Sequence, residues 1–348
     1  MVHTAREPRI GWTVVPNGEN WMGDAGRPDR QIRLQTVRAM PWMAVVDIVL
    51  RTPAADELRS LASTLSTFQR DNGPIQLHPG DLGWFSMRGA EATAQALRAW
   101  FCGDTLLALG LLDGPDGLLR LGIDPDQLDN EALARQVSAD ITDPDRGGLP
   151  AGEAVVEARG ATALQRVMLA DGWELDEPWT PLHCDLNDPV PDTLVTQTGL
   201  RVESVGPNRA AAWMEVHWSA FRGTAFGEAE RAEVVDWWTT MMDGPFAEQG
   251  RSVAALDSEG RMVAIAGVWS AGRGRPGLIE PMGTHRDHRG KGYGAAICQA
   301  AGFALREMGA SSAIVCAESS NVGAVATYAS AGFTPHPPVA DLLRQGTA

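Results

Sequence analysis

The sequence predicts an α/β protein made of two similar units in tandem. Strand-like runs such as residues 278–284 alternate with helix-like runs such as 295–307. The pattern of residues 164–173 returns at 325–333, and strand-like runs precede both copies at matching distances. A length of 348 residues with 44% hydrophobic content also favours two domains over one.

Each part of the chain has a predicted place in this plan. Residues 1–43 are rich in polar, Gly and Trp residues without a clear period, and we expect them to form an N-terminal arm. The first unit would span residues 44–185 and begin with a strand at 45–50. A linker rich in Pro and Asp would follow at 186–199. The second unit would then occupy residues 200–348.

The second unit carries the clearer pattern of strands and helices. A helix is expected from Asn208, and Asp257-Ser258-Glu259-Gly260 is typical of a hairpin turn. The other predicted elements are strands at 201–205, 252–256, 262–269 and 278–284 and a helix at 232–242.

A glycine-rich loop lies between the predicted strand 278–284 and the predicted helix 295–307. It reads Arg289-Gly290-Lys291-Gly292-Tyr293-Gly294. Glycine lets the backbone approach a ligand closely, and a helix N-terminus offers unpaired N–H groups to an anion. Lys291 precedes Gly292, where a P-loop has Ser or Thr, and the alternating glycines do not fit a dinucleotide-binding fold. The loop is therefore a candidate cradle for the diphosphate of another nucleotide cofactor.

Two ordered motifs resemble those of the GNAT superfamily of N-acetyltransferases. Arg289, Gly292 and Gly294 match its acyl-coenzyme A loop, Arg-x-x-Gly-x-Gly. Downstream, Asn321 and Tyr328 belong to the pattern Asn-x-x-Ala-x-x-x-Tyr-x-x-x-Gly-Phe, which is also typical of the family. The resemblance implies two tandem units, each with a mixed, mostly antiparallel sheet flanked by helices, in a plan similar to that of mycothiol synthase.

The resemblance also implies that the second unit binds acetyl-CoA as the acyl donor. In the family, the strand before the loop splays from its parallel neighbour and admits the pantetheine arm. At residues 284–286, Thr-His-Arg replaces the Val-x-Pro of many members. Asn321 would bond the pantetheine, or else simply cap its own helix. The expected cofactor-binding residues are Met282, Gly283, Thr284, Arg289, Gly290, Lys291, Gly292, Tyr293, Gly294 and Asn321.

Direct acyl transfer to an amine needs a base, an oxyanion site and an acid. The family motif implies that Tyr328 is the acid, with packing against the sheet as its alternative role. Glu280 is the first candidate for the base because it lies in a largely apolar run that would raise its pKa, although a solvated or salt-bridged carboxylate is the alternative. Glu318 and His285 are the other candidates. Backbone N–H groups near residues 282–284 would polarise the carbonyl.

The first unit lacks the groups that this chemistry needs. When Gly172 is aligned with Gly332, the loop falls, within one residue of the same offset, on Leu128-Asp129-Asn130-Glu131-Ala132-Leu133, which has two carboxylates and no glycine. Met168 stands at the position of Tyr328 and cannot donate a proton. We therefore expect the first unit to keep the fold without cofactor binding or chemistry, unless the similarity arose by chance.

Composition and charge limit the partners. The formal net charge of −15 disfavours nucleic acid, which needs a basic surface, and suits a cationic amine. No run reaches the roughly 18 to 20 apolar residues of a membrane span, and the first residues lack an apolar signal core, so we expect a cytoplasmic protein without a membrane partner. The four cysteines are scattered, so neither a metal site nor a disulfide framework is expected.

The acceptor leaves a weaker signal in the sequence. Trp237, Trp238, Met241 and Met242 lie on a helix that borders the acceptor cleft in the family, where they fit either an aromatic lip or core packing. The predicted function is acetyl-CoA-dependent transfer of an acetyl group to a primary amine of a small molecule, by a monomer or homodimer. The alternative is a non-catalytic acetyl-CoA-sensing or regulatory protein.

Overall fold

The structure is a computed structural model. It describes residues 47–114, 117–143, 146, 148–190, 192–222, 224 and 226–346. The predicted N-terminal arm at residues 1–43 and the start of the predicted strand 45–50 lie outside the described residues. Every element below belongs to a single unit, Asp47–Ala348.

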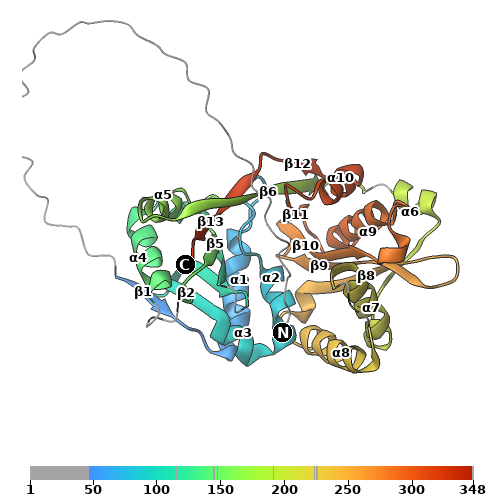
Figure 1. Cartoon of the computed structure of the whole chain (residues 1–348), viewed down its shortest axis with the longest axis horizontal. Helices are drawn as coiled ribbons and strands as arrows, with labels where there is room; N and C mark the ends of the chain where they lie inside the picture. The colour runs from blue at the N-terminus through green and yellow to red at the C-terminus, as the bar shows by residue number, and fades with distance from the viewer. Residues whose placement is uncertain are drawn as a thin grey trace, which may run out of the picture. The chain divides into compact units, whose positions relative to one another are not determined.

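The N-terminal half contains a sheet with helices on both faces (Figure 1). Its first long helix, α1, forms because Leu58, Leu61 and Leu65 make an apolar stripe that is fully buried or nearly so. The strands are β1 (Ile48–Arg51), β2 (Leu97–Cys102), β3 (Thr105–Leu112), β4 (Leu118–Ile123) and β5 (Ala154–Glu157), and the helices are α1 (Leu58–Phe68), α2 (Pro79–Phe85), α3 (Ala90–Ala96), α4 (Glu131–Thr142) and α5 (Thr162–Ala170).

The C-terminal half has the strands and helices that the sequence predicts, with shifted ends. The helix predicted at 232–242 begins earlier, at Glu228, because the Glu230 carboxylate accepts a hydrogen bond from the Gly227 N–H and stabilises the helix start. The predicted linker 186–199 contains a short helix. The elements are α6 (Thr193–Thr198), β7 (Arg201–Ser204), α7 (Ala210–Phe221), α8 (Glu228–Met242), β8 (Gly250–Leu256), β9 (Met262–Ser270), β10 (Pro276–Thr284), α9 (Tyr293–Glu307), β11 (Ser312–Glu318) and α10 (Val322–Ser330).

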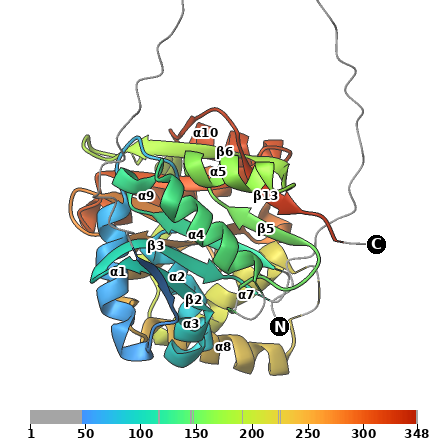
Figure 2. The ribbon, with the colours of Figure 1, turned by 90° about the vertical axis from the view of Figure 1, so that its left-hand side faces the viewer.

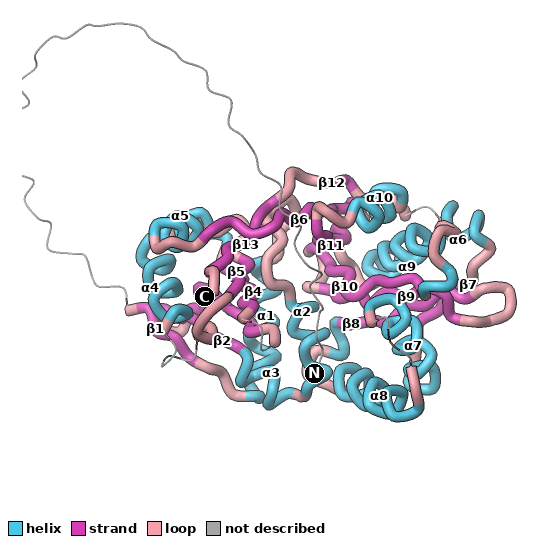
Figure 3. The backbone as a smooth tube through the Cα atoms, viewed as in Figure 1, coloured by secondary structure: helices cyan, strands magenta, loops and turns pink. Residues whose placement is uncertain are grey.

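The two halves exchange their last strands. β6 (Glu174–Asp185) follows α5 in the chain but pairs antiparallel with β11 of the other half. In return β13 (Val339–Arg344), near the C-terminus, pairs antiparallel with β5. Because β13 and β6 also pair with each other, one sheet runs through both halves in the order β1-β2-β3-β4-β5-β13-β6-β11-β10-β9-β8-β7, with the short β12 (Thr334–Pro335) beside β6 (Figure 3).

This exchange bears on the domain boundaries that the sequence suggests. The segment 174–185 belongs to the first unit by its place in the chain, yet it completes the sheet of the second. Each half-sheet therefore depends on a strand from the other half, and we propose 186–199 only as the covalent connection between the halves.

Helices cover both faces of the sheet, as Figures 1 and 2 show. Helices α4 and α5 pack on one face of the N-terminal half, and α9 and α10 on one face of the C-terminal half. A shared core joins the opposite faces of the two halves and includes side chains of α1, α2, α7 and α8. We call the face of β10 and β11 that packs in this shared core the inner face. Among the described residues, no helix is long and apolar enough to cross a membrane.

Candidate active site

Strands β10 and β11 begin side by side and then separate. Their parallel pairing joins Pro276–Leu278 to Ser312–Ile314. Past this stretch β10 forms a bulge against β9 between Ile279 and Met282. Pro281 lies in this bulge and has no N–H group to donate to a neighbouring strand. The separation is the splay that the resemblance to GNAT proteins implies.

Where β10 and β11 separate, some backbone N–H groups of β10 point into the space between the two strands. The His285 N–H donates to the Val263 carbonyl at 2.9 Å, so these two residues form a hydrogen-bonded pair of the β9–β10 ladder. Bonded and non-bonded pairs alternate along an antiparallel ladder, which makes Gly283 the next bonded residue. The N–H groups of Met282 and Thr284 therefore point away from β9, toward the β11 side.

The glycine-rich loop leads directly into α9. Gly290 and Gly292 have φ of 76° and 80°, a left-handed conformation that suits glycine. Gly292 is the N-cap of α9 and has no side chain to occupy the first N–H groups of the helix. These groups and the positive end of the helix dipole form a suitable site for a diphosphate. Gly294 has a different role, since a Cβ there would lie 3.0 Å from the Thr327 methyl of α10.

Hydrogen bonds to the end of α7 hold the segment before the glycines in place. Arg289 Nη2 donates to the Ala220 carbonyl at 2.9 Å, and the Arg286 N–H donates to Ser219 Oγ at 3.1 Å. Lys291 is exposed, with its Nζ 6.0 Å from the centre of the Tyr293 ring. Arg289 is thus engaged by the protein, and Lys291 is the freer of the two predicted cations.

Tyr328 of α10 is only 6% exposed and packs edge-on against Phe333, with ring centroids 5.7 Å apart. Burial raises the pKa of Tyr328 well above its usual value, and the Cys298 thiol and the Glu280 carboxylate raise that pKa further. Tyr328 therefore has the packing role and also lies within the electrostatic reach of the candidate base.

Glu280 does not have the apolar surroundings expected from its neighbours in the chain, and that expectation is wrong. Arg120 of β4 in the other half approaches it, with Nη2 3.8 Å from Glu280 Oε1. Arg120 Nη1 also lies 3.1 Å from the Asp81 carboxylate, which is almost completely buried. Burial and the nearby Glu280 raise the pKa of Asp81 well above its usual value, while Arg120 opposes them. The salt-bridged alternative for Glu280 is the one observed.

The other candidates have local structural roles. Glu318 is exposed at the end of β11. His285 Nδ1 accepts from the Asp287 N–H at 3.3 Å, and the ring contacts that of His288. Asn321 Oδ1 caps α10 by accepting from the Ala324 N–H at 3.0 Å, as its alternative role required. Its contact with pantetheine stays a prediction.

Sequence reasoning missed the groups that the N-terminal half brings to this place. Trp84 of α2 lies 5.3 Å from the His217 ring of α7, and His217 lies 4.9 Å from Phe221. Burial lowers the pKa of His217 to about 4, so the imidazole is neutral at neutral pH. Phe221 is next to Gly283, where an added Cβ would be 3.1 Å from its ring. A strand-and-helix pattern gives no sign of such contacts between halves.

The corresponding helix start in the N-terminal half is already occupied. Asn130 caps α4, and its Oδ1 accepts from the N–H groups of Ala132 and Leu133 at 3.0 and 3.1 Å. The flanking carboxylates of Asp129 and Glu131 pair with Arg166 at 3.1 and 2.6 Å. Among the described residues, no group of three or more His, Cys, Asp or Glu could hold a metal ion.

Comparisons with known proteins agree with this arrangement. Residues 210–333 match the model of the acetyltransferase (GNAT) family. No curated protein matches the chain. A solved tandem GNAT protein from the clavulanic acid biosynthesis pathway has a TM-score of 0.54 and 16% identity, over 87% of this chain and 99% of that one.

Two further solved structures have similar folds. A GCN5-related N-acetyltransferase from Sphaerobacter thermophilus has a TM-score of 0.51 and 18% identity, over 85% of this chain and 95% of that one. A GNAT-family acetyltransferase from Colwellia psychrerythraea has a TM-score of 0.52 and 13% identity, over 86% of this chain and all of that one. Residues 210–333 are thus similar to the GNAT acetyltransferase family, whose general chemistry is acyl-CoA-dependent acetyl transfer, and the chain has the fold of the tandem GNAT proteins.

Proposed function

We propose that this protein is an acetyl-CoA-dependent N-acetyltransferase that transfers the acetyl group directly to a primary amine of a small molecule. One observation carries the proposal: β10 and β11 separate after the Leu278–Ile314 pair, and Glu280 lies on β10 while the buried Tyr328 lies on the helix that follows β11. The uncapped start of α9 follows the same strand. We also propose that the protein works in the cytoplasm, as a monomer or homodimer and without a metal ion.

In this proposal the backbone does most of the cofactor binding. The N–H groups of Gly290 to Gly294 would hold the diphosphate, with Lys291 and Arg289 adding positive charge. The N–H groups of Met282 and Thr284 are available to pantetheine and to the thioester oxygen, because β9 does not use them. Bound acetyl-CoA would supply the acetyl group as a thioester.

Two side chains would move the protons. Glu280 accepts the proton that the attacking ammonium must lose, and Tyr328 donates its phenolic proton to the departing thiolate. The two steps support each other electrostatically. Ionised Glu280 raises the pKa of Tyr328, so protonation of Glu280 removes that effect and makes the phenol a better acid as the thiolate leaves.

A non-catalytic acetyl-CoA sensor is the alternative function, because the N-terminal half has already lost the corresponding groups. The presence of both the glycine loop and Tyr328 in the C-terminal half favours the enzyme. A sensor would need the loop but not a buried phenol at position 328.

A two-step measurement separates these functions. Acetyl-CoA should raise the melting temperature in either case, since any ligand that binds the folded state stabilises it. Release of free thiol with a panel of primary amines is expected only from the enzyme. Stabilisation by acetyl-CoA without thiol release from any amine would favour the sensor, and no stabilisation would contradict both functions.

A further inference from the structure

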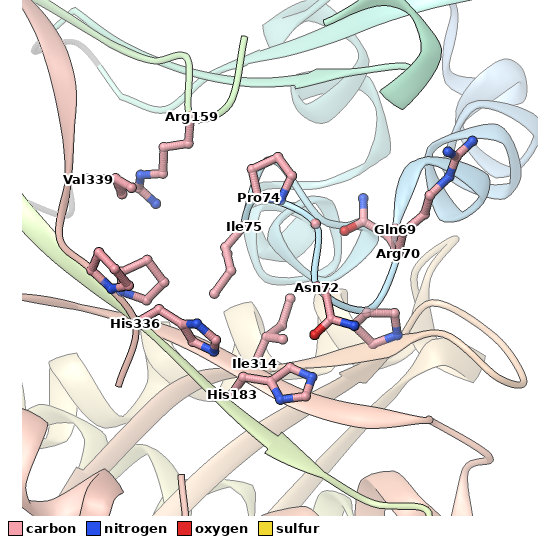
Figure 4. A pocket seen from close by; sticks show the side chains of 14 residues that line it. Gln69, Arg70, Asn72, Pro74, Ile75, Arg159, His183, Ile314, His336 and Val339 are labelled. Atoms are coloured by element: carbon pink, nitrogen blue, oxygen red, sulfur yellow. The ribbon is translucent and has the colours of Figure 1, made fainter. Parts of the chain in front are cut away.

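A cavity of about 350 Å³ lies between the two halves of the molecule. One wall is the loop after α1, with Asn72 and Ile75. The other comes from β6, β11 and the segment between β12 and β13, with His183, Ile314 and His336. Figure 4 shows His183 and His336 across from the loop residues, with Ile75 and Ile314 between them. The strand exchange thus forms a site to which both halves contribute.

The cavity lies close to the splay. Leu278 and Ile314 are paired on the inner face of β10 and β11, and Ile314 lines the cavity. Two residues further along these strands are Glu280 and Cys316. A strand rises about 3.3 Å per residue, so these positions are about 7 Å from the paired residues. A small molecule in the cavity could therefore extend a reactive group to the place where the strands separate.

A chain of buried and partly buried charged groups links the cavity to Glu280. Arg159 lines the cavity and pairs with Asp341 at 2.7 Å and with Glu157 at 3.5 Å. Glu157 lies opposite Arg120 in the parallel β4–β5 ladder. The carboxylates paired with Arg120 are those of Asp81, Asp113 and Glu280. These carboxylates outnumber the guanidinium groups of Arg159, Arg120 and Arg88, but none of the carboxylates lines the cavity. A cation is therefore favoured at the Glu280 end of this chain of charges and not beside the arginines of the lining.

The cavity wall also contains a polar atom that lacks a partner. His183 Nε2 is buried and has no hydrogen bond with any of the described residues, and Asp71 Oδ1 is 3.8 Å away from it. An unpaired buried polar atom is costly unless a ligand or water completes it. The rest of the lining combines apolar side chains, among them Ile75, Ile314 and several prolines, with the polar side chains of Gln69, Asn72, His336 and two arginines. The lining therefore suits a molecule with an apolar body and a hydrogen-bonding group.

We propose that this cavity holds the body of the acceptor, a small cationic amine with an apolar portion, and directs its ammonium group toward Glu280. The inference rests on the proposed function and adds that the N-terminal half helps to select the acceptor. A cation bound beside Asp81 would favour the ionised form of that carboxyl group, whose pKa is otherwise raised by burial. The half that has lost the cofactor cradle would thus keep a role in substrate binding.

The test uses a substitution that fills the cavity. Ile75→Trp enlarges a half-buried side chain of the lining, and Leu50→Trp makes the same kind of change in β1, away from the cavity. Both variants and the wild-type chain are assayed by thiol release with methylamine, phenethylamine and an amino sugar. Of phenethylamine and the amino sugar, one will be the better substrate of the wild type. For that amine we expect Ile75→Trp to raise KM about tenfold, which corresponds to the loss of a few contacts. KM for methylamine, KM for acetyl-CoA and every value for Leu50→Trp should stay within about twofold of wild type.

A second variant and a binding measurement decide the remaining outcomes. His183→Phe keeps an aromatic ring, slightly larger than imidazole, and removes the polar atoms, and it should weaken binding of the amino sugar more than that of phenethylamine. Where no amine reacts, the rise in melting temperature with each amine is compared between the wild type and Ile75→Trp. An active Ile75→Trp with unchanged KM for every amine would overturn the inference alone, and so would a panel in which no amine reacts or binds while acetyl-CoA does. A chain that acetyl-CoA does not stabilise would instead contradict the proposed function.

Discussion

The two halves of the molecule begin the same helix in opposite ways. In the C-terminal half, α9 starts at Gly292, which has no side chain and leaves the first N–H groups free. In the N-terminal half, α4 starts at Asn130, which occupies two of those groups with its own oxygen. The comparison teaches that the same fold can fill its anion site with its own cap or keep it open for a ligand.

The second difference lies one helix later. Tyr328 of α10 and Met168 of α5 occupy equivalent buried positions, each before a glycine with positive φ. Met168 has no exposed surface and belongs to the core of its half. The phenol at this position can donate a proton, whereas the thioether cannot. We interpret the N-terminal half as a structural partner and the C-terminal half as the place of chemistry.

Tyr328→Phe tests this comparison between the halves and should have the largest effect of the proposed variants on kcat. Loss of the phenolic proton donor should lower kcat about 100-fold, in the range typical of general acid catalysis. Acetyl-CoA should still raise the melting temperature, because the loop is unchanged. The matched control is Met168→Leu, which conserves volume in the other half and should leave kcat within about twofold. Normal turnover by Tyr328→Phe would show that another group protonates the thiolate.

Gly292→Asp would make the active loop resemble its inactive counterpart. A Cβ at φ of 80° strains the backbone, and the added carboxylate would cap α9 and repel a diphosphate. We expect the Kd for acetyl-CoA, measured by calorimetry, to rise about 30-fold or more, which corresponds to about 2 kcal/mol. Gly172→Asp places the same residue at another positive φ, in the N-terminal half, and controls for strain. Equal affinity for acetyl-CoA in both variants would show that the loop does not bind acetyl-CoA.

The sequence could predict the groups whose spacing along the chain is diagnostic. The loop 289–294, the strand before it and Tyr328 all lie in one stretch of the chain, so local pattern and motif spacing were enough to predict the strand, the loop and the helices that carry them. The pairing of β6 with β11 joins segments more than 100 residues apart, and neither segment encodes its partner. The prediction of apolar surroundings for Glu280 failed for the same reason. Its chain neighbours are apolar, but its actual neighbour Arg120 comes from the other half.

Arg120→Gln tests whether the halves cooperate at Glu280. Removal of the guanidinium leaves neighbouring carboxylates without their cation and favours their protonated forms. The acid limb of the pH profile of kcat/KM should therefore move to higher pH, so that kcat/KM falls several-fold on that limb and partly recovers at alkaline pH. Arg166→Gln removes an exposed arginine that pairs with two carboxylates and should leave the profile unchanged. A uniform loss at every pH would instead indicate a purely structural role.

Asn130→Ala should have the smallest effect of the proposed variants. It tests what the Asn130 side chain contributes by capping the N-terminus of α4. The substitution removes the cap from α4 and should lower the free energy of unfolding by about 1 kcal/mol, as is typical for loss of an N-cap side chain. Denaturant titration measures this change, and kcat and the Kd for acetyl-CoA should both stay within about twofold of wild type. Asn130→Asp, which retains a cap oxygen, should recover most of the stability. A new acetyl-CoA site in Asn130→Ala, detected as a second binding event by calorimetry, would mean that the cap alone closes the N-terminal cradle. We expect none, because the carboxylates of Asp129 and Glu131 still flank that helix start and would repel a diphosphate.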